Sequence, residues 1–402
     1  MIEARTGNKL STNSSEAANL YNNAMDLILG SESGGAEALD KAIALDREFA
    51  LAAIARFYVA RDVGETNANE YKELALKGAE GASQWEQEHI HILAGLIEQP
   101  GSTREKALEY IKENPADLLV ISQLTGSMFF YDGPKKLDNV LQTFESVEQA
   151  LADDWAFLAR LGFAASEAGQ RKRGRVLIER ALAIRPQALY TIHALAHMLH
   201  DEGASEESAK ILREWLEVHE GGAREGQMYG HVQWHLALAE WQLGKSADAM
   251  ARYQKYCAPQ TTTCGPILTL ADCGGFLLRD YLESGKACAL NKDVNEHIAL
   301  VWGMIGHPFI ALHVAGLYAS AGDLDGLNRC EDALLAGTEG ANRDMSLALV
   351  LSLKGLVAGE YERAAGILAT MSAADRIGIG GSNVERILVD LIEEKCQALA
   401  RG

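Results

Sequence analysis

The chain has 402 residues, 48% of them hydrophobic, and its 56 acidic side chains outnumber the 37 basic ones, giving a formal net charge of −19. This balance argues against nucleic acid or an anionic membrane as the main partner, because both select a basic face. Only 7 prolines and 7% aromatic residues accompany abundant Ala, Leu, Glu and Gly, which is typical of a mostly helical protein.

The sequence shows no apolar run near the roughly 20 residues that a membrane-spanning helix needs, and its first residues lack the apolar stretch of a signal peptide. We therefore expect a cytoplasmic protein. The six cysteines never form a CxxC motif, and their spacing suits neither a zinc site nor a disulfide framework. We expect reduced, mostly buried thiols at Cys257, Cys264, Cys273, Cys288, Cys330 and Cys396.

Apolar helical stretches recur in pairs along the chain, which is the pattern of helix-turn-helix repeats. Near the N-terminus, residues 37–60 and 88–114 look like degenerate repeats, and Gly133-Pro134 marks a break between helices. The clearest unit spans residues 155–186. It has a turn at Gly169 and an Ala-Leu-x-x-x-Pro ending, both typical of a tetratricopeptide repeat of about 34 residues.

Later units contain the same kind of turn glycine followed by small residues, at Gly203, Gly244, Gly322 and Gly359. Between them, residues 257–275 contain many turn residues and are expected to form a loop or short irregular pieces. No strand pattern competes with this interpretation. We therefore predict an all-α fold, a right-handed α-solenoid of irregular tetratricopeptide-like repeats.

No low-complexity linker divides the chain, so we expect residues 1–402 to form one continuous solenoid domain. Degenerate repeats would occupy residues 1–120, the best-defined repeats residues 150–260, and the C-terminal repeats residues 276–402. Each repeat would bury one face against its neighbours, and the stack would leave a concave surface open to a ligand.

Histidines gather in the best-defined repeats. His193 and His197 form an i,i+4 pair in HALAH, and His231 and His235 form another in HVQWH. Two imidazoles at this spacing lie on one helical face, with Cβ atoms about 5–6 Å apart, so either pair could hold one metal ion or one polar ligand.

The two pairs are separated by 38 residues, which is close to one repeat length. They therefore fall near equivalent positions on the first helices of consecutive repeats. In a tetratricopeptide stack such helices lie about 8–10 Å apart and line the concave face, so we expect the four rings to converge on one pocket. Aligning the turn glycines shifts the second pair by three residues, about 60° around the helix.

The same alignment extends this surface. His313 lies nine residues before its turn glycine, as His235 does, so we expect it on the same face, and His200 extends the first pair by one turn. Neutral imidazoles suit Zn, Fe, Cu or Ni, and an imidazole with its ordinary pKa suits general acid–base work.

Several chemistries stay open for these histidines. An iron site of two histidines and one carboxylate would need a nearby acid, for which Asp201, Glu202 and Glu240 are candidates. A haem with an axial histidine is another alternative. The simplest interpretation is that each histidine only hydrogen-bonds a carbonyl or a carboxylate.

Two further features could belong to a site. Residues 378–383 (GIGGSN) precede a helix and could present N–H groups to an anion, although the simpler interpretation is that Ser382 or Asn383 caps that helix. Trp234 flanks the second histidine pair and could stack on an aromatic ligand or pack in the core.

Taken together, these segments resemble the tetratricopeptide repeat protein 38 (StaR-like) family over nearly the whole chain. LSTNSSEA is similar to the family's opening LST-x-S-x-EA, and EQEHIHI, which contains His89, to its E-Q-x-H segment. HALAHML is similar to its H-x-x-AH motif, GHVQWHLAL to its CH-x-x-WH motif, FIALHVAGLYASAG to the segment with its later histidine, and GGSNVER to GGSN-x-x-R. Gly230 stands where the family often has Cys.

The resemblance implies little chemistry, because animal members have no settled activity and a bacterial relative is known only to lie among antibiotic-biosynthesis genes. It does place the histidines within family motifs. We therefore predict a His-lined concave pocket for a small molecule, with a transition metal or haem as alternative cofactors, in an enzyme of specialised metabolism.

In this hypothesis, the ligands or acid–base groups are His193, His197, His231 and His235. Residues contacting a cofactor would be His89, His313, Trp234, Ser382 and Asn383. The alternatives are a protein–protein scaffold, which is the usual role of tetratricopeptide arrays, and a sensor that binds a small molecule without turnover.

Overall fold

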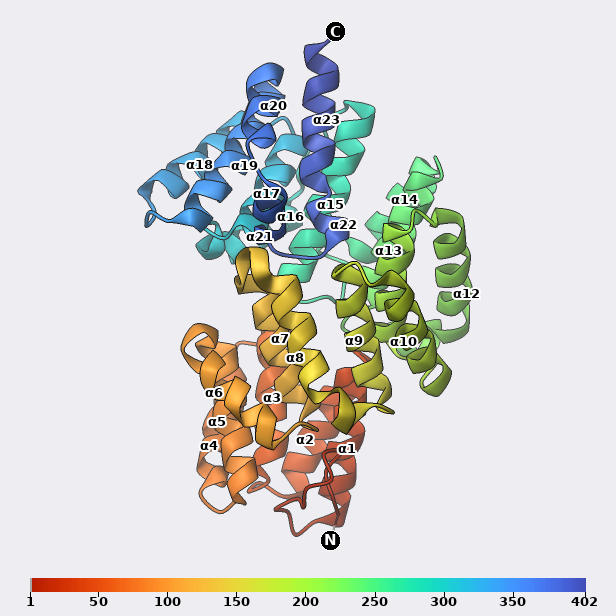
Figure 1. Cartoon of the computed structure of the whole chain (residues 1–402), viewed down its shortest axis with the longest axis vertical. Helices are drawn as coiled ribbons and strands as arrows, with labels where there is room; N and C mark the ends of the chain where they lie inside the picture. Colours follow the sequence, from red (N-terminus) through yellow and green to blue (C-terminus); the bar gives the residue numbers. More distant parts are fainter. Residues whose placement is uncertain (1) are drawn as a thin grey trace. The chain divides into compact units, whose positions relative to one another are not determined.

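The computed structural model describes residues 2–402, apart from the side chains of residues 220 and 222. Helices make up all the regular structure in this part of the chain, and the extended backbone pairs there only in a single antiparallel bridge between Glu3 and Lys9 (Figure 1). The predicted all-α class is therefore confirmed. Across residues 2–402, no helix has the length and apolarity needed to cross a membrane.

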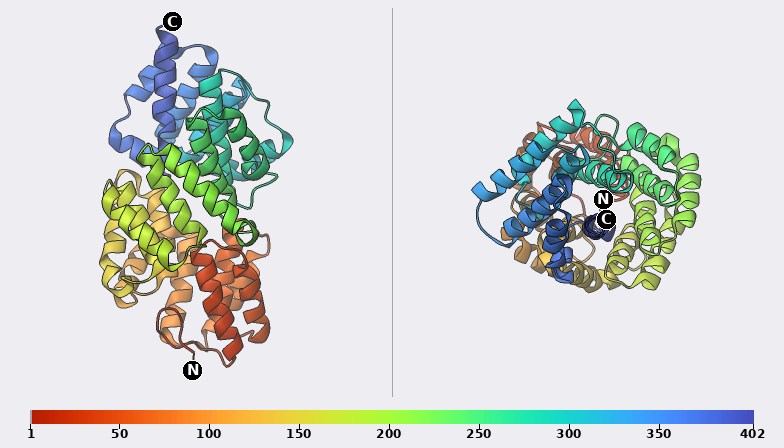
Figure 2. Two further views of the ribbon diagram at one scale, coloured as in Figure 1. Left: turned by 90° about the vertical axis from the view of Figure 1, so that its right-hand side faces the viewer. Right: turned by 90° about the horizontal axis from the view of Figure 1, so that it is seen from above.

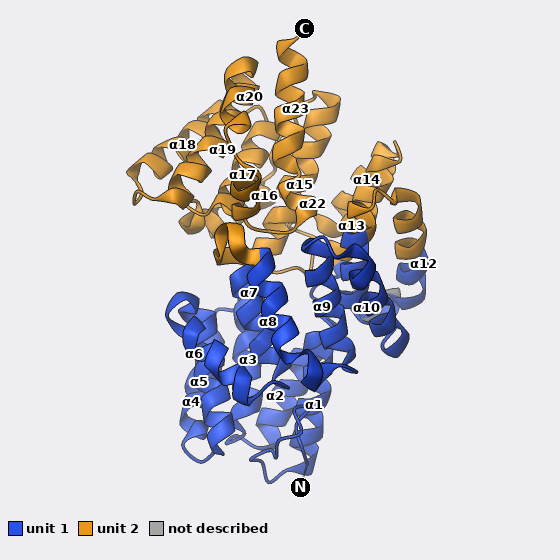
Figure 3. Ribbon diagram, in the orientation of Figure 1, with its two compact units in different colours: residues 1–129, 137–198, 214–229 blue, residues 130–136, 199–213, 230–402 orange. Residues whose placement is uncertain are grey.

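The chain divides into two compact units (Figure 3). Unit 1 comprises the residues up to Phe129, together with Leu137–Met198 and Glu214–Tyr229. Unit 2 comprises Phe130–Lys136, Leu199–Arg213 and Gly230–Gly402. The expectation of one continuous domain stays a prediction.

Most helices belong to one unit. The helices of unit 1 are α1 (Ser15–Leu29), α2 (Gly35–Leu45), α3 (Ala50–Val63), α4 (Ala68–Ala79), α5 (Gln84–Glu98), α6 (Pro100–Glu113), nearly all of α7 (Leu118–Tyr131) and α8 (Lys136–Leu151), α9 (Trp155–Glu167) and α10 (Arg171–Ile184). Two further helices, α11 (Leu189–Asp201) and α12 (Ser205–Ala223), are each divided between the units.

Unit 2 begins with the 3₁₀ turn η1 (Gly133–Lys135). Its other helices are α13 (Tyr229–Gln242), α14 (Ser246–Arg252), the π-helix η2 (Tyr253–Cys257), α15 (Pro266–Ser284), α16 (Lys292–Val301), the 3₁₀ turn η3 (Trp302–Met304), α17 (Pro308–Ser320), α18 (Leu324–Ala336), α19 (Ala341–Ala358), α20 (Tyr361–Ala369), α21 (Ala373–Gly378), α22 (Asn383–Arg386) and α23 (Leu388–Ala400).

Within each unit, successive helices pack as antiparallel pairs, such as α1 with α2, α9 with α10 and α17 with α18 (Figure 2). The predicted turn glycines lie between such helices and all have positive φ, the region that glycine enters without strain: 84° at Gly169, 69° at Gly203, 74° at Gly244, 67° at Gly322 and 78° at Gly359. Helix-turn-helix pairs of the α-solenoid type therefore build the chain, as predicted.

The unit predicted at residues 155–186 corresponds to α9 and α10, and its sequence explains both its start and its packing. Asp154 caps α9 by accepting hydrogen bonds from the backbone N–H groups of Ala156 and Phe157. The two helices touch at Gly162 and Gly174. A Cβ atom on Gly174 would lie 2.7 Å from the Gly162 carbonyl oxygen, so only glycine permits this approach.

The prediction for residues 257–275 was wrong in its second half, because α15 begins at Pro266 and continues through Gly274 and Gly275. These two glycines lie within α15, where they permit close helix packing and do not form a turn. A Cβ atom on Gly274 would lie 2.7 Å from the backbone oxygen of His313, on α17. The pair of glycines therefore brings α15 close to the helix that contains a predicted site histidine.

Each unit has its own hydrophobic core. Its largest fully buried side chains include Phe49, Phe57 and Phe157 in unit 1 and Trp234 and Phe276 in unit 2. All six cysteines are free thiols, and four of them are buried, as expected. Burial raises the pKa of the Cys273 thiol, for example, to about 12, which keeps it protonated and unreactive at neutral pH.

Replacing Gly274 by Ala should destabilise the protein by about 1–3 kcal/mol, because the added methyl group forces α15 away from α17. Gly366 offers a matched control, since it lies exposed in α20 and an added Cβ would meet no other atom within 4 Å. Gly366→Ala should stabilise by about 0.5–1 kcal/mol. Denaturant unfolding measures both changes, and an equal response of the two variants would contradict the packing role of Gly274.

Candidate histidine–carboxylate sites

The first predicted pair lies on α11 in unit 1, where His193 and His197 are 6% and 4% exposed. Their Nε2 atoms are 2.7 Å apart and their rings are nearly perpendicular, at 87°. At this distance one N–H donates to the lone pair of the other ring, so both nitrogens point at the same place. Phe163 and Tyr190 pack against the His193 ring at 5.8 and 5.7 Å between ring centroids.

This geometry is close to that of two ligands of one metal ion. Imidazole nitrogens bound to zinc at about 2.0–2.1 Å lie roughly 3 Å from each other. A metal ion could therefore replace the shared proton with a small rotation of the two rings. The i,i+4 spacing thus places both rings on one face of α11, as the sequence predicted.

The second predicted pair lies on α13 in unit 2, where His231 and His235 are 2% and 3% exposed. Their ring centroids are 4.7 Å apart. The Nδ1 atom of His231 lies 2.6 Å from Oδ1 of Asp272 on α15, and the indole N–H of Trp234 donates to the Asp272 carbonyl oxygen at 2.9 Å. Trp234 is fully buried and stacks on the His231 ring.

Asp272 determines how His231 presents its other nitrogen. Burial by itself would lower the pKa of His231, but the charge and hydrogen bond of Asp272, together with Glu385, outweigh it and raise that pKa above its usual value. A carboxylate on Nδ1 fixes the orientation of the ring and makes Nε2 a stronger base, which is the usual arrangement behind metal-binding histidines. Sequence reasoning missed Asp272, although it is an isolated acid in an apolar stretch.

His313 lies on α17 and is fully buried. Its Nδ1–H donates to the Phe309 carbonyl oxygen at 2.7 Å, which leaves the lone pair on Nε2. Burial lowers the pKa of His313, and neither Glu385 nor the Phe309 carbonyl restores it. His313 is therefore a neutral imidazole at physiological pH.

The glycine-rich loop at residues 378–383 is held in unit 2 by hydrogen bonds. Ser382 caps α22, and Oε2 of Glu385 accepts hydrogen bonds from both the backbone N–H and the hydroxyl of Ser382, at 2.7 and 2.8 Å. The simpler interpretation is thus confirmed for Ser382, while the Asn383 amide donates to Asp201 at 2.7 Å. The helix predicted after this loop is divided into α22 and α23, for which the structure offers no physical account.

Two cations fix the same loop. Lys136 and Arg386 both donate to the Gly381 carbonyl oxygen. Gly381 has φ 68°, and a Cβ atom there would lie 2.3 Å from the Phe309 ring. Both the positive φ and the lack of space for a Cβ atom explain why glycine occupies this position.

Glu385 is the acid that connects these parts of unit 2. It is 6% exposed and acts electrostatically on His231, Asp272, His313 and Arg279. In unit 2, His231, His313 and the glycine-rich loop therefore all interact with one buried carboxylate. Sequence reasoning singled out the loop but missed Glu385, which lies just after it, on α22.

His89 lies in unit 1, on α5, and repeats the arrangement of His231. Its Nδ1 atom is 2.6 Å from Oδ2 of Asp117, which also accepts a hydrogen bond from the Tyr110 hydroxyl at 2.7 Å. Burial opposes ionisation of Asp117, but the His89 and Tyr110 contacts outweigh it and lower the pKa of Asp117. Asp117 was also missed by sequence reasoning.

Two of the three acids proposed as the third ligand of an iron site, Glu240 and Asp201, contact other residues. Glu240 forms an ion pair with Arg252 at 2.8 Å and contacts Arg213 at 3.4 Å. Asp201 accepts the hydrogen bond from Asn383 and lies 3.7 Å from Nδ1 of His200. These contacts favour a site built from imidazoles over one built from two histidines and a carboxylate.

Comparison with known proteins identifies the type of repeat in the middle of the chain. A tetratricopeptide-repeat family model matches residues 131–273. No curated protein matches the chain. Among solved structures, a human IFIT1 dimer with PPP-AAAA is similar at 16% identity and a TM-score of 0.45, with 98% of this chain and 97% of that chain covered. Residues 131–273 are thus of the tetratricopeptide-repeat type.

Asp117→Asn should destabilise the protein by about 1–3 kcal/mol at neutral pH, because the buried His89 and Tyr110 side chains lose the charged acceptor of their hydrogen bonds. Since the pKa of Asp117 is lowered on folding, its contribution is present above the unfolded value of about 3.9 and is lost as pH falls through the folded value. The difference in the free energy of unfolding between the wild type and Asp117→Asn should therefore become smaller in acid. Denaturant unfolding from pH 7 to pH 3 measures it.

Asp153→Asn is the control for that experiment, because the Asp153 side chain is fully exposed and contacts Arg180 only at 3.5 Å. It should show no such pH dependence. A difference between wild type and Asp117→Asn that stays constant down to pH 3 would contradict an ionised, hydrogen-bonded Asp117.

Proposed function

We propose that this tetratricopeptide-repeat protein binds one transition-metal ion through His193, His197, His231 and His235. The observation that carries the proposal is the pair of buried Nε2 atoms 2.7 Å apart on α11. Two buried imidazoles that share one proton are already positioned for a divalent cation, which would replace that proton.

The repeat register of the sequence supports a single ion for both pairs. The second pair follows the first after 38 residues, and tetratricopeptide repeats place equivalent positions of consecutive first helices next to each other. The oriented ring of His231 also supports the proposal, because a carboxylate on Nδ1 commonly accompanies a ligating Nε2.

Four neutral nitrogen ligands favour Zn, Cu, Ni, Co or Fe over Mg or Ca, which prefer oxygen. Such an ion would act as a Lewis acid on a small molecule bound at the concave face. With the resemblance to the tetratricopeptide repeat protein 38 (StaR-like) family, this supports a cytoplasmic enzyme of specialised metabolism. In that role Trp234 and His313 would shape the site around the bound molecule, together with the hydrogen bonds of Asp272.

Metal analysis of protein purified without a histidine tag tests the proposal. We expect about one transition-metal ion per chain in the wild type and less than a tenth of it in His193→Ala/His235→Ala. The control is His91→Ala, which removes an exposed histidine on α5 and should keep the full metal content. A metal-free wild type that also fails to bind added Zn²⁺ or Co²⁺ would refute the proposal.

Asp272→Asn should weaken Zn²⁺ binding by about 10–100-fold without abolishing it, because the amide no longer orients His231 as a charged acceptor does. Competition with a chromophoric chelator measures the dissociation constant. Unchanged affinity, in a variant whose circular dichroism matches the wild type, would show that His231 is not a ligand.

A second function is favoured by the tetratricopeptide match at residues 131–273, since such arrays commonly bind protein partners. If the protein is a scaffold, it should form a stoichiometric complex with one partner, and His193→Ala/His235→Ala should bind that partner as well as the wild type does. If this variant bound neither the metal nor the partner, partner binding would instead depend on the metal site.

A further inference from the structure

Unit 1 contains a small cavity at His89, separate from the histidine pairs. The cavity has a volume of about 20 Å³. Its walls are mostly apolar or aromatic and include Trp85, whereas its polar lining comes from Arg5, Thr6, His89 and Asp117. A volume of this size accommodates about one water molecule.

His89 directs a hydrogen-bond acceptor to this cavity. Its side chain is 3% exposed, and Nδ1 is occupied by Asp117 at 2.6 Å. The opposite ring nitrogen, Nε2, has no hydrogen-bond partner among the residues that the structure describes. Because the Asp117 carboxylate accepts the Nδ1 proton, this contact selects the tautomer whose Nε2 is the acceptor, and that nitrogen requires a donor.

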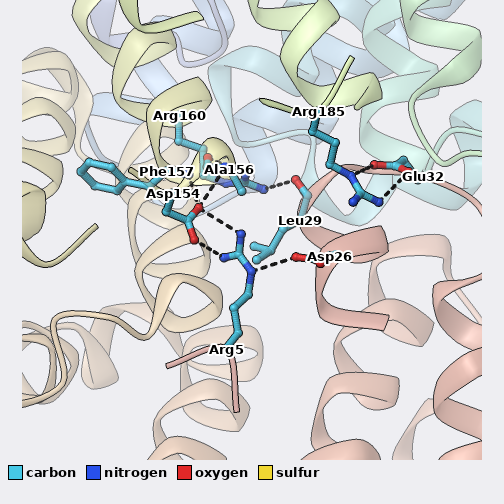
Figure 4. A network of polar contacts seen from close by, with 9 residues as sticks. All are labelled: Arg5, Asp26, Leu29, Glu32, Asp154, Ala156, Phe157, Arg160 and Arg185. Carbon is cyan, nitrogen blue, oxygen red and sulfur yellow. Dashed lines mark hydrogen bonds and ion pairs between the residues drawn. The ribbon is translucent and has the colours of Figure 1, made fainter. Parts of the chain in front are cut away.

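Residues 4–6 of the N-terminal segment cover the cavity, since Ala4, Arg5 and Thr6 form part of its wall. Arg5 holds the segment in place, as Figure 4 shows. Its Nε donates to Asp26 at 2.9 Å and its NH2 group to Asp154 at 3.0 Å. These ion pairs connect the segment to α1 and to the residue that caps α9.

Hydrogen bonds also attach the segment on both sides of Arg5. The Glu3 carbonyl oxygen accepts one from the Asn22 amide at 2.8 Å, and the Ser11 N–H donates one to Glu86 at 2.8 Å. It has little regular structure of its own. Apart from the buried side chains of Ala4 and Leu10, the segment is held by partly exposed polar contacts, and such a segment opens at lower cost than the helices beneath it.

We propose that His89 is the recognition residue of a second, small-molecule site, and that residues 4–6 are its lid, held shut by Arg5. The ligand class is a small neutral molecule with one hydroxyl group. Most of the wall is apolar, and its two charged groups, Arg5 and Asp117, already have partners, so the cavity favours a neutral ligand. The Nε2 atom of His89 selects a hydroxyl donor. In the closed state the cavity admits a water molecule, and lid opening would admit an aromatic or aliphatic alcohol.

Carbethoxylation by diethyl pyrocarbonate, mapped by mass spectrometry, tests the lid, because the reagent attacks an accessible neutral imidazole. His91 on the same helix is exposed and serves as the internal reference. In the wild type we expect His89 to react at least 10-fold more slowly than His91. Arg5→Ala should raise the His89 rate at least 10-fold and leave the His91 rate unchanged.

Arg185→Ala is the matched control. It breaks a neighbouring ion pair, between Arg185 and Glu32 at 2.6 Å, but Arg185 does not line the cavity (Figure 4). It should leave His89 protected. The lid proposal would be overturned if His89 were carbethoxylated at the same rate in the wild type and Arg5→Ala. It would also be overturned if Arg5→Ala and Arg185→Ala raised that rate equally. If Arg5→Ala also exposes His313 and is therefore unfolded, Asp26→Asn takes its place, with a smaller rise expected.

Phenol and toluene, which are similar in size and differ by the hydroxyl group, test the ligand class. In Arg5→Ala, phenol should slow the carbethoxylation of His89 at least 5-fold at a concentration where toluene changes it less than 2-fold. Equal protection by both, or by neither, would overturn the proposed hydroxyl ligand. Neither result affects the metal site, because no residue of the four-histidine proposal takes part.

Discussion

The pairing of buried imidazole nitrogens is the interaction on which the candidate sites depend. A buried ring nitrogen without a partner costs free energy, so a hydrogen bond to one ring nitrogen stabilises a buried histidine in one orientation. Asp117 supplies it to His89, Asp272 to His231 and the Phe309 carbonyl oxygen to His313. The remaining nitrogen is thereby fixed in direction, which prepares it to bind a metal ion or a ligand.

Close helix packing makes these pairings possible. Asp272 reaches His231 from α15, and the same helix touches α17 at Gly274, where no larger residue fits. The glycine-rich loop adds Glu385, which is anchored by the capping of Ser382. The helices of unit 2 thus serve as a rigid frame, and the functional side chains project from positions that the packing determines. Sites built on such elements keep their geometry better than sites on loops.

Local sequence patterns predicted the helices, the turn glycines and the histidine pairs, because these features depend on spacing within one or two turns. They failed at residues 266–275, since a glycine needed for helix contact looks the same in sequence as a glycine needed for a turn. They also missed Asp117 and Asp272, which lie 28 and 41 residues from their histidines. Such pairings depend on tertiary structure, and one sequence contains no local signal for them.

The most direct test of the metal site is X-ray absorption spectroscopy on the Co²⁺- or Zn²⁺-loaded protein. It reports which atoms surround the metal and how far away they lie. The account predicts a first shell of about four imidazole nitrogens at roughly 2.0–2.1 Å, with the outer-shell scattering that imidazole rings produce. A shell of oxygen atoms only, or one that includes cysteine sulfur near 2.3 Å, would contradict ligation by His193, His197, His231 and His235.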